Sequence, residues 1–357
     1  MSSPTDHAIE LHEESGLLEA SGDLTSAEAK CREALAIFEA EDGPESPDVA
    51  NLLFSLGVIL EKQLRFDDAG ACGRRSLAII EPLLPLFEDS TGLMIQAHAL
   101  ALLGTVHRQK GEYPAGRVVL ERAIAIAEQL SDPNELITAL NNLGMLCKFA
   151  GWFDRGARSY ANAMDIILPI TGEEHETVAT LYHNIGGLEH ARGRYQQAEH
   201  PSRRAWEIRR ALLGDENLSV QADAVAWAAV LDGLERYKES RPIYEKAIAI
   251  YERDLGADHY EVAATLHNLS VVELSEGNPE RAMELCRRSL QIKKDLLGME
   301  HPDSALTAMN LGAILLELGE KEEAAPLCAA ALVTMKASLA PDHPHIGLAQ
   351  NLVKATR

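Results

Sequence analysis

The sequence lacks the patterns that mark a secreted, disulfide-stabilised domain or a membrane-spanning chain. No run in its 357 residues approaches the 18 apolar residues of a transmembrane helix, and its first residues, MSSPTDHAIELHEE, are too polar for a signal peptide. Its five cysteines are scattered, with no CxxC pair and no Cys/His cluster. An odd, dispersed set predicts free thiols in a reducing compartment, so we expect a cytoplasmic protein.

Catalytic signatures are also missing. The sequence has no GxSxG, no phosphate-binding loop, no GxGxxG after a strand and no HExxH, and no long segment has the two-residue period of a strand. We therefore expect neither an enzyme nor a bound cofactor. The formal charge is −22, from 55 acidic and 33 basic residues. This excess argues against nucleic acid or an anionic membrane as the partner.

What the sequence does contain is a long internal repeat. Segment 259–298 is followed by segment 301–340, which has the same pattern 42 residues later. One small residue recurs in eight copies along the chain, as Ser15, Gly57, Gly104, Gly144, Gly186, Ala228, Ser270 and Gly312. Within each copy the apolar residues are three and four positions apart, which predicts two amphipathic helices, and stacked copies of such a unit form a solenoid.

Two further sets of equivalent positions, each called a column below, recur in the copies. Seven residues after the small residue is a turn position that holds Gly in six of the eight copies and Leu64 or Glu235 in the other two. Gly is expected there because a helix often ends in the left-handed conformation. A second small residue follows twelve positions later, as Ala34, Ser76, Ala123, Ala163, Ala205, Ala247, Ser289 and Ala331. Small residues on both helices predict that the two helices approach closely.

Together these columns resemble the tetratricopeptide repeat (TPR). The long copies, with LLGDEN, LGADH and LLGMEH at their junctions, are similar to the kinesin-light-chain class of TPR. The resemblance implies an all-α, right-handed α-solenoid of about eight TPR-like helix-turn-helix repeats plus a C-terminal capping helix. We expect one domain, 1–357, with repeats at approximately 7–43, 46–86, 93–131, 134–172, 175–214, 217–256, 259–298 and 301–340, and a cap at 343–357.

Histidines recur at the junctions, as His175, His259, His301 and His343. Because equivalent positions lie a whole repeat apart, they cannot converge within the roughly 2.0–2.3 Å that zinc ligands require. We expect no metal site and assign these histidines to helix starts. Cys31, Cys286 and Cys328 share one column of the second helices and are expected to pack in the core.

Basic pairs in the second helices allow two interpretations. They are Arg74–Arg75, Arg203–Arg204 and Arg287–Arg288, joined by Arg209–Arg210 and Lys293–Lys294. The pairs form either a basic ridge for an acidic partner or a solvated outer face balanced by neighbouring Glu. We favour the solvated face.

The first helices carry the polar residues that bear on binding. Just before the small residue stand Asn142, Asn184, Asn268 and Asn310. In TPR proteins this Asn lines the inner groove and can hydrogen-bond the backbone of a bound peptide, a role that suits an amide because it offers both a donor and an acceptor. The alternative is that it ties adjacent repeats together.

Other inner-face positions divide the expected groove. The middle repeats contribute a largely cationic set, His98, Arg108, Gln109, Asn141, Lys148, His183 and His190. The C-terminal repeats contribute an apolar set, Val271, Leu274, Met309 and Leu316, with His267 beside it. An apolar strip of this length is typical of a contact surface. We expect a peptide ligand with an acidic part and a hydrophobic part.

These observations predict a non-catalytic adaptor or scaffold that captures a protein or peptide segment in its concave groove, as a monomer or weak homodimer. Two alternatives remain open. One is a sensor whose solenoid changes shape when it binds a peptide signal. The other is a self-assembling structural protein that holds another copy in the apolar half of the groove.

Overall fold

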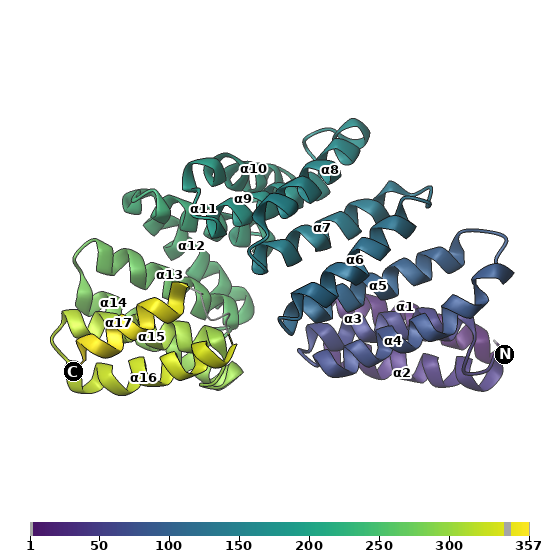
Figure 1. Cartoon of the computed structure of the whole chain (residues 1–357), viewed down its shortest axis with the longest axis horizontal. Helices are drawn as coiled ribbons and strands as arrows, with labels where there is room; N and C mark the ends of the chain where they lie inside the picture. The colour runs from purple at the N-terminus through teal and green to yellow at the C-terminus, as the bar shows by residue number, and fades with distance from the viewer. Residues whose placement is uncertain (1–2, 339–343, 357) are drawn as a thin grey trace. The chain divides into compact units, whose positions relative to one another are not determined.

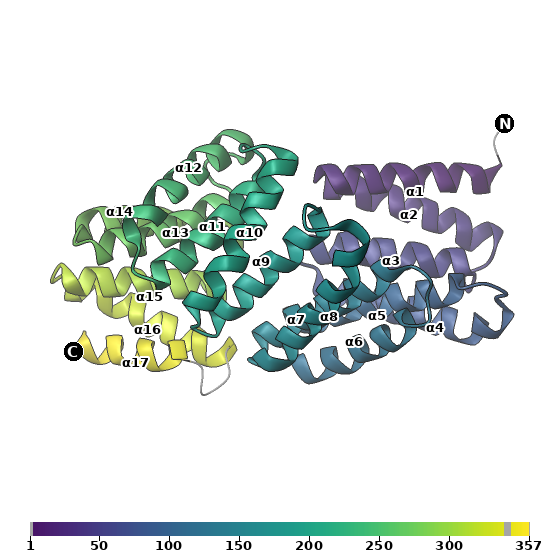
Figure 2. The same cartoon turned by 90° about the horizontal axis from the view of Figure 1, so that it is seen from above.

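The computed structural model describes residues 3–338 and 344–356, and within them the elements are helices, with no strand. Helix pairs follow one another along the chain (Figures 1 and 2). The first helices are α1 (Pro4–Ser21), α3 (Pro47–Lys62), α5 (Thr91–Gln109), α7 (Pro133–Phe149), α9 (Glu176–Ala191), α11 (Leu218–Gly233), α13 (Tyr260–Ser275) and α15 (Pro302–Glu317). The second helices are α2 (Leu24–Glu41), α4 (Phe66–Leu83), α6 (Tyr113–Ala127), α8 (Phe153–Thr171), α10 (Tyr195–Leu213), α12 (Tyr237–Leu255), α14 (Pro279–Leu297) and α16 (Lys321–Ser338). A short 3₁₀ helix, η1 (Leu84–Leu86), follows α4, and α17 (Pro344–Ala355) is the last helix. The predicted all-α helical-repeat solenoid is confirmed.

The helices pack as two compact units, Met1–Glu173 with α1 to α8 and Glu174–Arg357 with α9 to α17. In both units a second helix packs against its own first helix and against the first helix of the next pair. First helices of successive pairs also touch, as α3, α5 and α7 do in the first unit. The single domain over 1–357 stays a prediction, and the predicted boundaries at Ala340 and His343 lie outside the described residues.

All eight turn positions adopt the left-handed backbone conformation that the column of glycines predicts. The two that are not glycine do so as well, with φ of 63° at Leu64 and 59° at Glu235. The same backbone hydrogen bonds close the turn in each case; at Leu64, for example, the following Arg65 N–H donates to Leu60 O at 2.9 Å. The turn geometry is therefore set by the repeat, and these two residues occupy a backbone region that a Cβ disfavours.

Leu64→Gly should stabilise the first unit by about 1 kcal/mol, because glycine reaches this conformation without a steric penalty. Leu64 is 59% exposed, so little apolar burial is lost. Chemical denaturation should show a higher midpoint, and Glu235→Gly should act in the same way on the second unit. Gly22→Leu, at the same turn position of the first pair, is the reverse control and should lower the midpoint. A lower midpoint for Leu64→Gly would contradict this account.

Small residues bring the two helices of a pair together. At Gly104 and Gly144 an added Cβ would lie 2.4 Å from side-chain atoms of Leu120 and Tyr160 on the second helix of the same pair, and at Gly57 it would lie 3.4 Å from Cys72 Cβ on α4. The second small column is at most 1% exposed at every position. Where this column carries Ser, the hydroxyl is satisfied: Ser289 Oγ donates to Ala263 O at 2.6 Å. The predicted close approach of the helices is confirmed.

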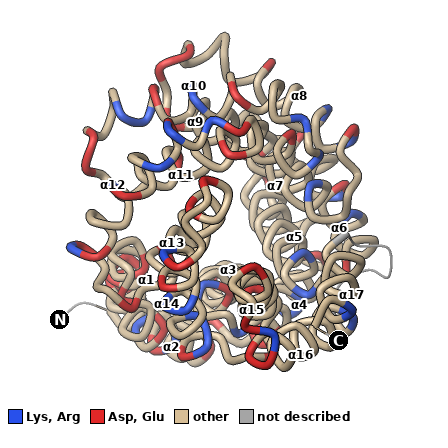
Figure 3. The backbone as a smooth tube through the Cα atoms, turned by 90° about the vertical axis from the view of Figure 1, so that its left-hand side faces the viewer, with Lys and Arg blue, Asp and Glu red and all other residues tan. Residues whose placement is uncertain are grey.

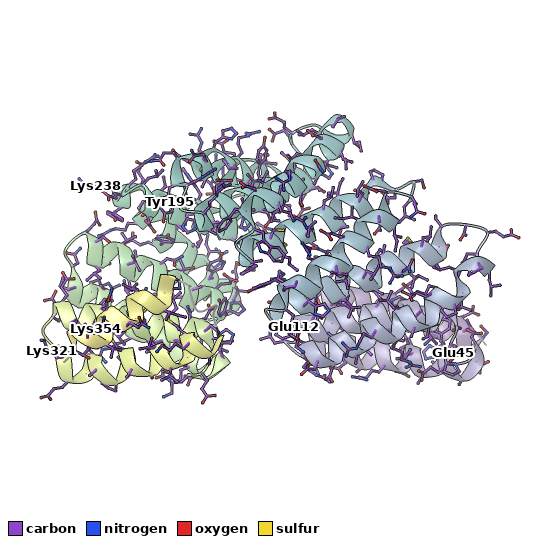
Figure 4. All side chains as sticks on the ribbon, in the orientation of Figure 1. Glu45, Glu112, Tyr195, Lys238, Lys321 and Lys354 are labelled. Carbon is purple, nitrogen blue, oxygen red and sulfur yellow. The ribbon has the colours of Figure 1, made fainter. Side chains whose placement is uncertain are left out.

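The junction histidines start helices. The Nδ1 atoms of His175, His259 and His301 each accept the backbone N–H two residues further on, at 3.2 Å, and so cap α9, α13 and α15. His343 lies outside the described residues. An aromatic residue begins several second helices, as Tyr195, labelled in Figure 4, begins α10.

The cysteine column belongs to the core. Cys31, Cys286 and Cys328 are each 0% exposed, and the Cys286 thiol donates to the Thr307 carbonyl of the next repeat at 3.5 Å. Burial raises the pKa of Cys286 to about 12, which keeps it a thiol at neutral pH. The predicted core role of this column is confirmed.

The last helix, α17, covers the end of the second unit. It packs against α15 and α16, and its Ile346 and Ala349 are buried in the same core as Leu311 and Met335. This agrees with the expected cap. Among the described residues, no helix is long and apolar enough to span a membrane.

Candidate binding face of the first helices

First helices of the first unit surround a hollow of about 300 Å³. Its apolar lining comes from Phe54, Val58, Ala101 and Leu102, and its polar lining from Glu61, His98, Thr105, Glu135, Thr138 and Asn142. On α3 and α7 the lining residues are three or four positions apart, and α5 adds the adjacent Ala101 and Leu102 to the same spacing, so each helix turns one stripe towards the hollow. Asn142 is thus placed where the sequence predicted a ligand contact, and its role there stays a prediction.

A fixed polar contact orders one wall of this hollow. The His98 ring stacks on Phe54 with 4.8 Å between ring centroids, and its Nε2 lies 3.0 Å from Glu135 Oε2. On α3, Glu61 accepts the Gln109 amide at 3.1 Å. This wall therefore consists of an aromatic ring and of polar groups that already contact one another. His98 and Gln109 were predicted as ligand contacts, but in the structure both side chains bind a carboxylate of the chain itself.

A second hollow of about 170 Å³ lies beside the first, between α1 and α3. Both hollows share Phe54 and Val58, so these two side chains stand between them. His12 Nε2 lies 2.9 Å from Ser55 Oγ and links the two helices across the smaller hollow. The helices α1, α3, α5 and α7 thus carry two adjoining hollows that share part of their lining.

Beyond Glu61 the same face carries two cations that form no ion pair with any carboxylate the structure describes. Arg108 on α5 and Lys148 on α7 lie over the Phe149 ring, at 5.4 and 5.3 Å from its centroid, and neither forms an ion pair with a described carboxylate. Burial lowers the pKa of both groups, and Arg108 lowers that of Lys148 further. Phe149 is 53% exposed. Two cations around an exposed ring favour a ligand group that is acidic and lies beside an apolar one.

In the second unit, one buried carboxylate lies within ion-pair distance of a histidine and an arginine. Asp223 on α11 is 2% exposed, with His183 Nδ1 at 2.7 Å and Arg209 Nε at 2.8 Å from its two oxygens. Arg209 also donates to Thr180 Oγ1 at 3.1 Å. His183 was expected as a cationic ligand contact, but the structure uses it to link α9 to α11.

The outer face of the second helices is balanced, as favoured from the sequence. Arg75 pairs with Glu39 and Arg288 with Glu252, and Figure 3 shows acidic and basic residues interspersed along the helices. The basic-ridge alternative is wrong for Arg209 and for Lys293, which is 4% exposed, because both turn into the contact between repeats.

The predicted apolar set is only partly on the surface. Val271 is 37% exposed, and Leu274 and Leu316 are half-buried against the C-terminal core. Met309 is 1% exposed and packs inside that core, so its assignment to the groove is wrong. The physical reason is that Met309, on α15, packs into the C-terminal core and does not face solvent.

The asparagine column splits between the two roles foreseen for it. Asn310 lies 3.1 Å, through Nδ2, from Nε2 of the buried His267, and so ties α15 to α13 as the alternative interpretation proposed. Asn142 lines the large hollow. Asn184, Asn268 and the neighbouring Asn141 are half-buried on their helices. His190 meets the Tyr195 ring edge-on, with centroids 5.4 Å apart.

Sequence reasoning missed Phe54, Glu61, Glu135 and the two threonines of the large hollow. They lie on the same stripes as Asn142 and His98, so helical spacing from those residues is the signal that would have found them. Taken one at a time, these residue types do not indicate a binding site.

Comparison with known families identifies the repeat. Two models of the tetratricopeptide repeat match the chain, one at residues 8–81, 136–211 and 222–295 and the other at 96–134 and 304–345. Protein KINESIN LIGHT CHAIN-RELATED 1 of Arabidopsis thaliana is 23% identical over 264 residues, which cover 72% of this chain and 42% of that protein. The chain spans less than half the length of the curated relatives it matches.

Solved structures share the fold at low identity. A Rap protein complexed with Competence and Sporulation Factor aligns with a TM-score of 0.60 and 14% identity, over 98% of this chain and 97% of that one. NprR in complex with its cognate peptide NprX aligns with a TM-score of 0.57 and 16% identity, over 88% of this chain and 83% of that one. At this identity the likeness concerns the fold alone.

Proposed function

The chain belongs to the tetratricopeptide repeat family, and from this premise we propose that it is a non-catalytic adaptor or scaffold that captures a peptide or protein segment on its first helices. The predicted family resemblance is thereby confirmed, and the similarity to a kinesin light chain-related protein agrees with the predicted class. Tetratricopeptide repeats serve as protein-interaction scaffolds, so the finer question is which surface binds and what it binds.

One observation carries the proposal: the hollow of about 300 Å³ on α3, α5 and α7, with a smaller hollow beside it. Apolar floors with a few polar groups at the edge are typical of sites that take side chains of a ligand. The two similar structures named for a bound peptide or factor support a peptide as the occupant. Arg108 and Lys148 at the edge favour an acidic residue in that peptide.

The experiment is selection from a phage-displayed random peptide library on the immobilised chain, followed by affinity measurement of the selected peptides. Ala101→Trp places an indole in the large hollow and should weaken those peptides at least about tenfold, since they lose the pocket for an apolar side chain. Val118→Trp is the matched control, because Val118 is a 59% exposed residue of the second helix α6. Equal affinity for the wild type and Ala101→Trp would place binding elsewhere.

The acidic part of the ligand is tested with the same selected peptides. Arg108→Glu combined with Lys148→Glu should weaken acidic peptides and flatten the salt dependence of their binding, because the two cations no longer attract them. Peptides without acidic residues serve as the internal comparison. Unchanged binding of the acidic peptides would remove this part of the proposal and leave the hollow as the site.

A peptide-responsive sensor is the second candidate, favoured by the likeness to NprR with its peptide NprX. It differs from a scaffold in requiring a change of shape on binding. Small-angle scattering of the chain with and without a selected peptide distinguishes the two: a changed radius of gyration supports the sensor, and an unchanged one the scaffold.

A further inference from the structure

A set of three positions in the second unit recurs two repeats further on, and the second copy lacks its acid. Advancing each position by 84 residues turns His183, Arg209 and Asp223 into His267, Lys293 and Thr307. In the first copy, Asp223 lies 2.7 Å from His183 and 2.8 Å from Arg209. In the second copy, a histidine and a cation occupy the same places, and threonine replaces the carboxylate.

Lys293 is buried without a counter-charge. It is 4% exposed, its Nζ donates to Thr307 Oγ1 at 3.1 Å, and the ammonium lies 6.0 Å from the centre of the Tyr260 ring. No described carboxylate forms an ion pair with it. Burial lowers its pKa, and the pull of Asp303 opposes that shift. A hydroxyl and a ring face 6.0 Å away replace little of the hydration that a buried ammonium loses.

His267 and Ser304 add two unmet hydrogen-bonding groups. Nε2 of His267 faces the amide Nδ2 of Asn310 at 3.1 Å, so Nε2 accepts and the ring proton lies on Nδ1. That Nδ1 is buried and has no hydrogen-bond partner, and the same holds for the Ser304 hydroxyl, one turn before Thr307. Burial lowers the pKa of His267 to about 3, so the ring is a neutral donor at neutral pH.

Among the residues that the structure describes, the surrounding titratable groups do not supply the missing charge. Asp303 carries the nearest carboxylate that acts on both Lys293 and His267, and it already accepts the Tyr260 hydroxyl. His345, on α17, adds repulsion and no acid. Within the described part of the chain, the cluster therefore has donors from α13, α14 and α15 and no negatively charged acceptor at the place that Asp223 fills two repeats earlier.

We propose that Lys293, His267 and Ser304 form a binding site for one carboxylate group supplied from outside the chain, at the position equivalent to the side chain of Asp223. Asn310, half-buried on the first-helix face, holds Nε2 of His267 and so leaves Nδ1 as the unpartnered nitrogen of that ring. The group is either a small free carboxylate or an acidic side chain of a ligand. The proposal does not depend on the hollow of the first unit.

The test measures thermal unfolding of the full chain while formate replaces chloride at constant ionic strength. A bound carboxylate stabilises the folded state by mass action, so the midpoint of the wild type should rise by about 2–4 °C. Lys293→Met, which copies Met335 at the equivalent position of the next repeat, should remove that rise. Thr307→Asp, which copies Asp223, should raise the midpoint without formate and abolish the response to it.

Two results overturn the proposal: a wild-type midpoint that ignores formate, or a response that survives in Lys293→Met. If Thr307→Asp does not fold, the comparison of wild type with Lys293→Met still decides. A short capped peptide with a single Glu, added in place of formate, then separates the sources. A rise in midpoint with this peptide, lost with its Gln counterpart, assigns the site to a ligand side chain; a rise with formate alone assigns it to a free carboxylate.

Discussion

Gly186→Val should destabilise the second unit by about 3 kcal/mol. Gly186 lies on α9 where α10 crosses it, and an added Cβ would lie 2.1 Å from Ser202 Oγ and 3.0 Å from the Ser202 backbone nitrogen. A side chain can rotate away, but a backbone atom cannot, so relief requires α10 to move. The change is measured as a lower midpoint in urea unfolding followed by circular dichroism.

Gly16→Ala is the matched control. Gly16 also lies inside a first helix, yet a Cβ there would meet nothing within 4 Å. Alanine favours the helix over glycine by about 1 kcal/mol, so this variant should be slightly more stable than the wild type. If Gly186→Val retained the wild-type midpoint, the close contact between α9 and α10 would not be what holds this pair together.

Asp223→Leu should cost about 3–5 kcal/mol, because it leaves one partner of a buried ion pair behind. The Arg209 side chain is 12% exposed and would lose the carboxylate that lies 2.8 Å from its Nε. His183 would lose its partner at the same time. Urea unfolding of the full chain should show the loss as a lower midpoint of the transition that reports on the second unit.

The double variant Arg209→Met with Asp223→Leu separates the lost ion pair from a general effect of altering this position. Replacing a buried ion pair by apolar residues of similar size is often neutral, so the second substitution should recover most of the stability. If the double variant were as unstable as Asp223→Leu alone, the shape of the Asp223 side chain would matter and the buried charge of Arg209 would not.

The sequence predicts the helical framework of this protein well, because the framework arises from local patterns that recur in every repeat. A helix places residues three and four positions apart on one stripe, and the same stripe returns in every copy. The turn column is the clearest case, since even Leu64 and Glu235 adopt the left-handed backbone that the glycines around them require. The small columns follow for the same reason, because helices that cross closely leave no room for a larger side chain.

The binding face was less predictable, because its residues are decided by partners in the next repeat. His98 meets Glu135, His183 meets Asp223 and His267 meets Asn310, over sequence separations of 37, 40 and 43 residues. Whether such a histidine is bound within the chain depends on the one residue that the neighbouring helix places opposite it. Met309 shows the same limit for apolar residues, since the position that Val225 holds half-buried two repeats earlier is core at Met309.

The sequence by itself therefore determined the all-α repeat, its turns, its helix caps and the family to which the chain belongs. Among the described residues, the tertiary structure alone decided that Arg108 and Lys148 form no ion pair, that Arg209 forms one with Asp223, and that Lys293 forms none. The physical reason is the range of the interactions involved. Helix periodicity and turn strain act within a few residues. A buried charge, by contrast, needs a partner of opposite charge, and that partner comes from a neighbouring repeat.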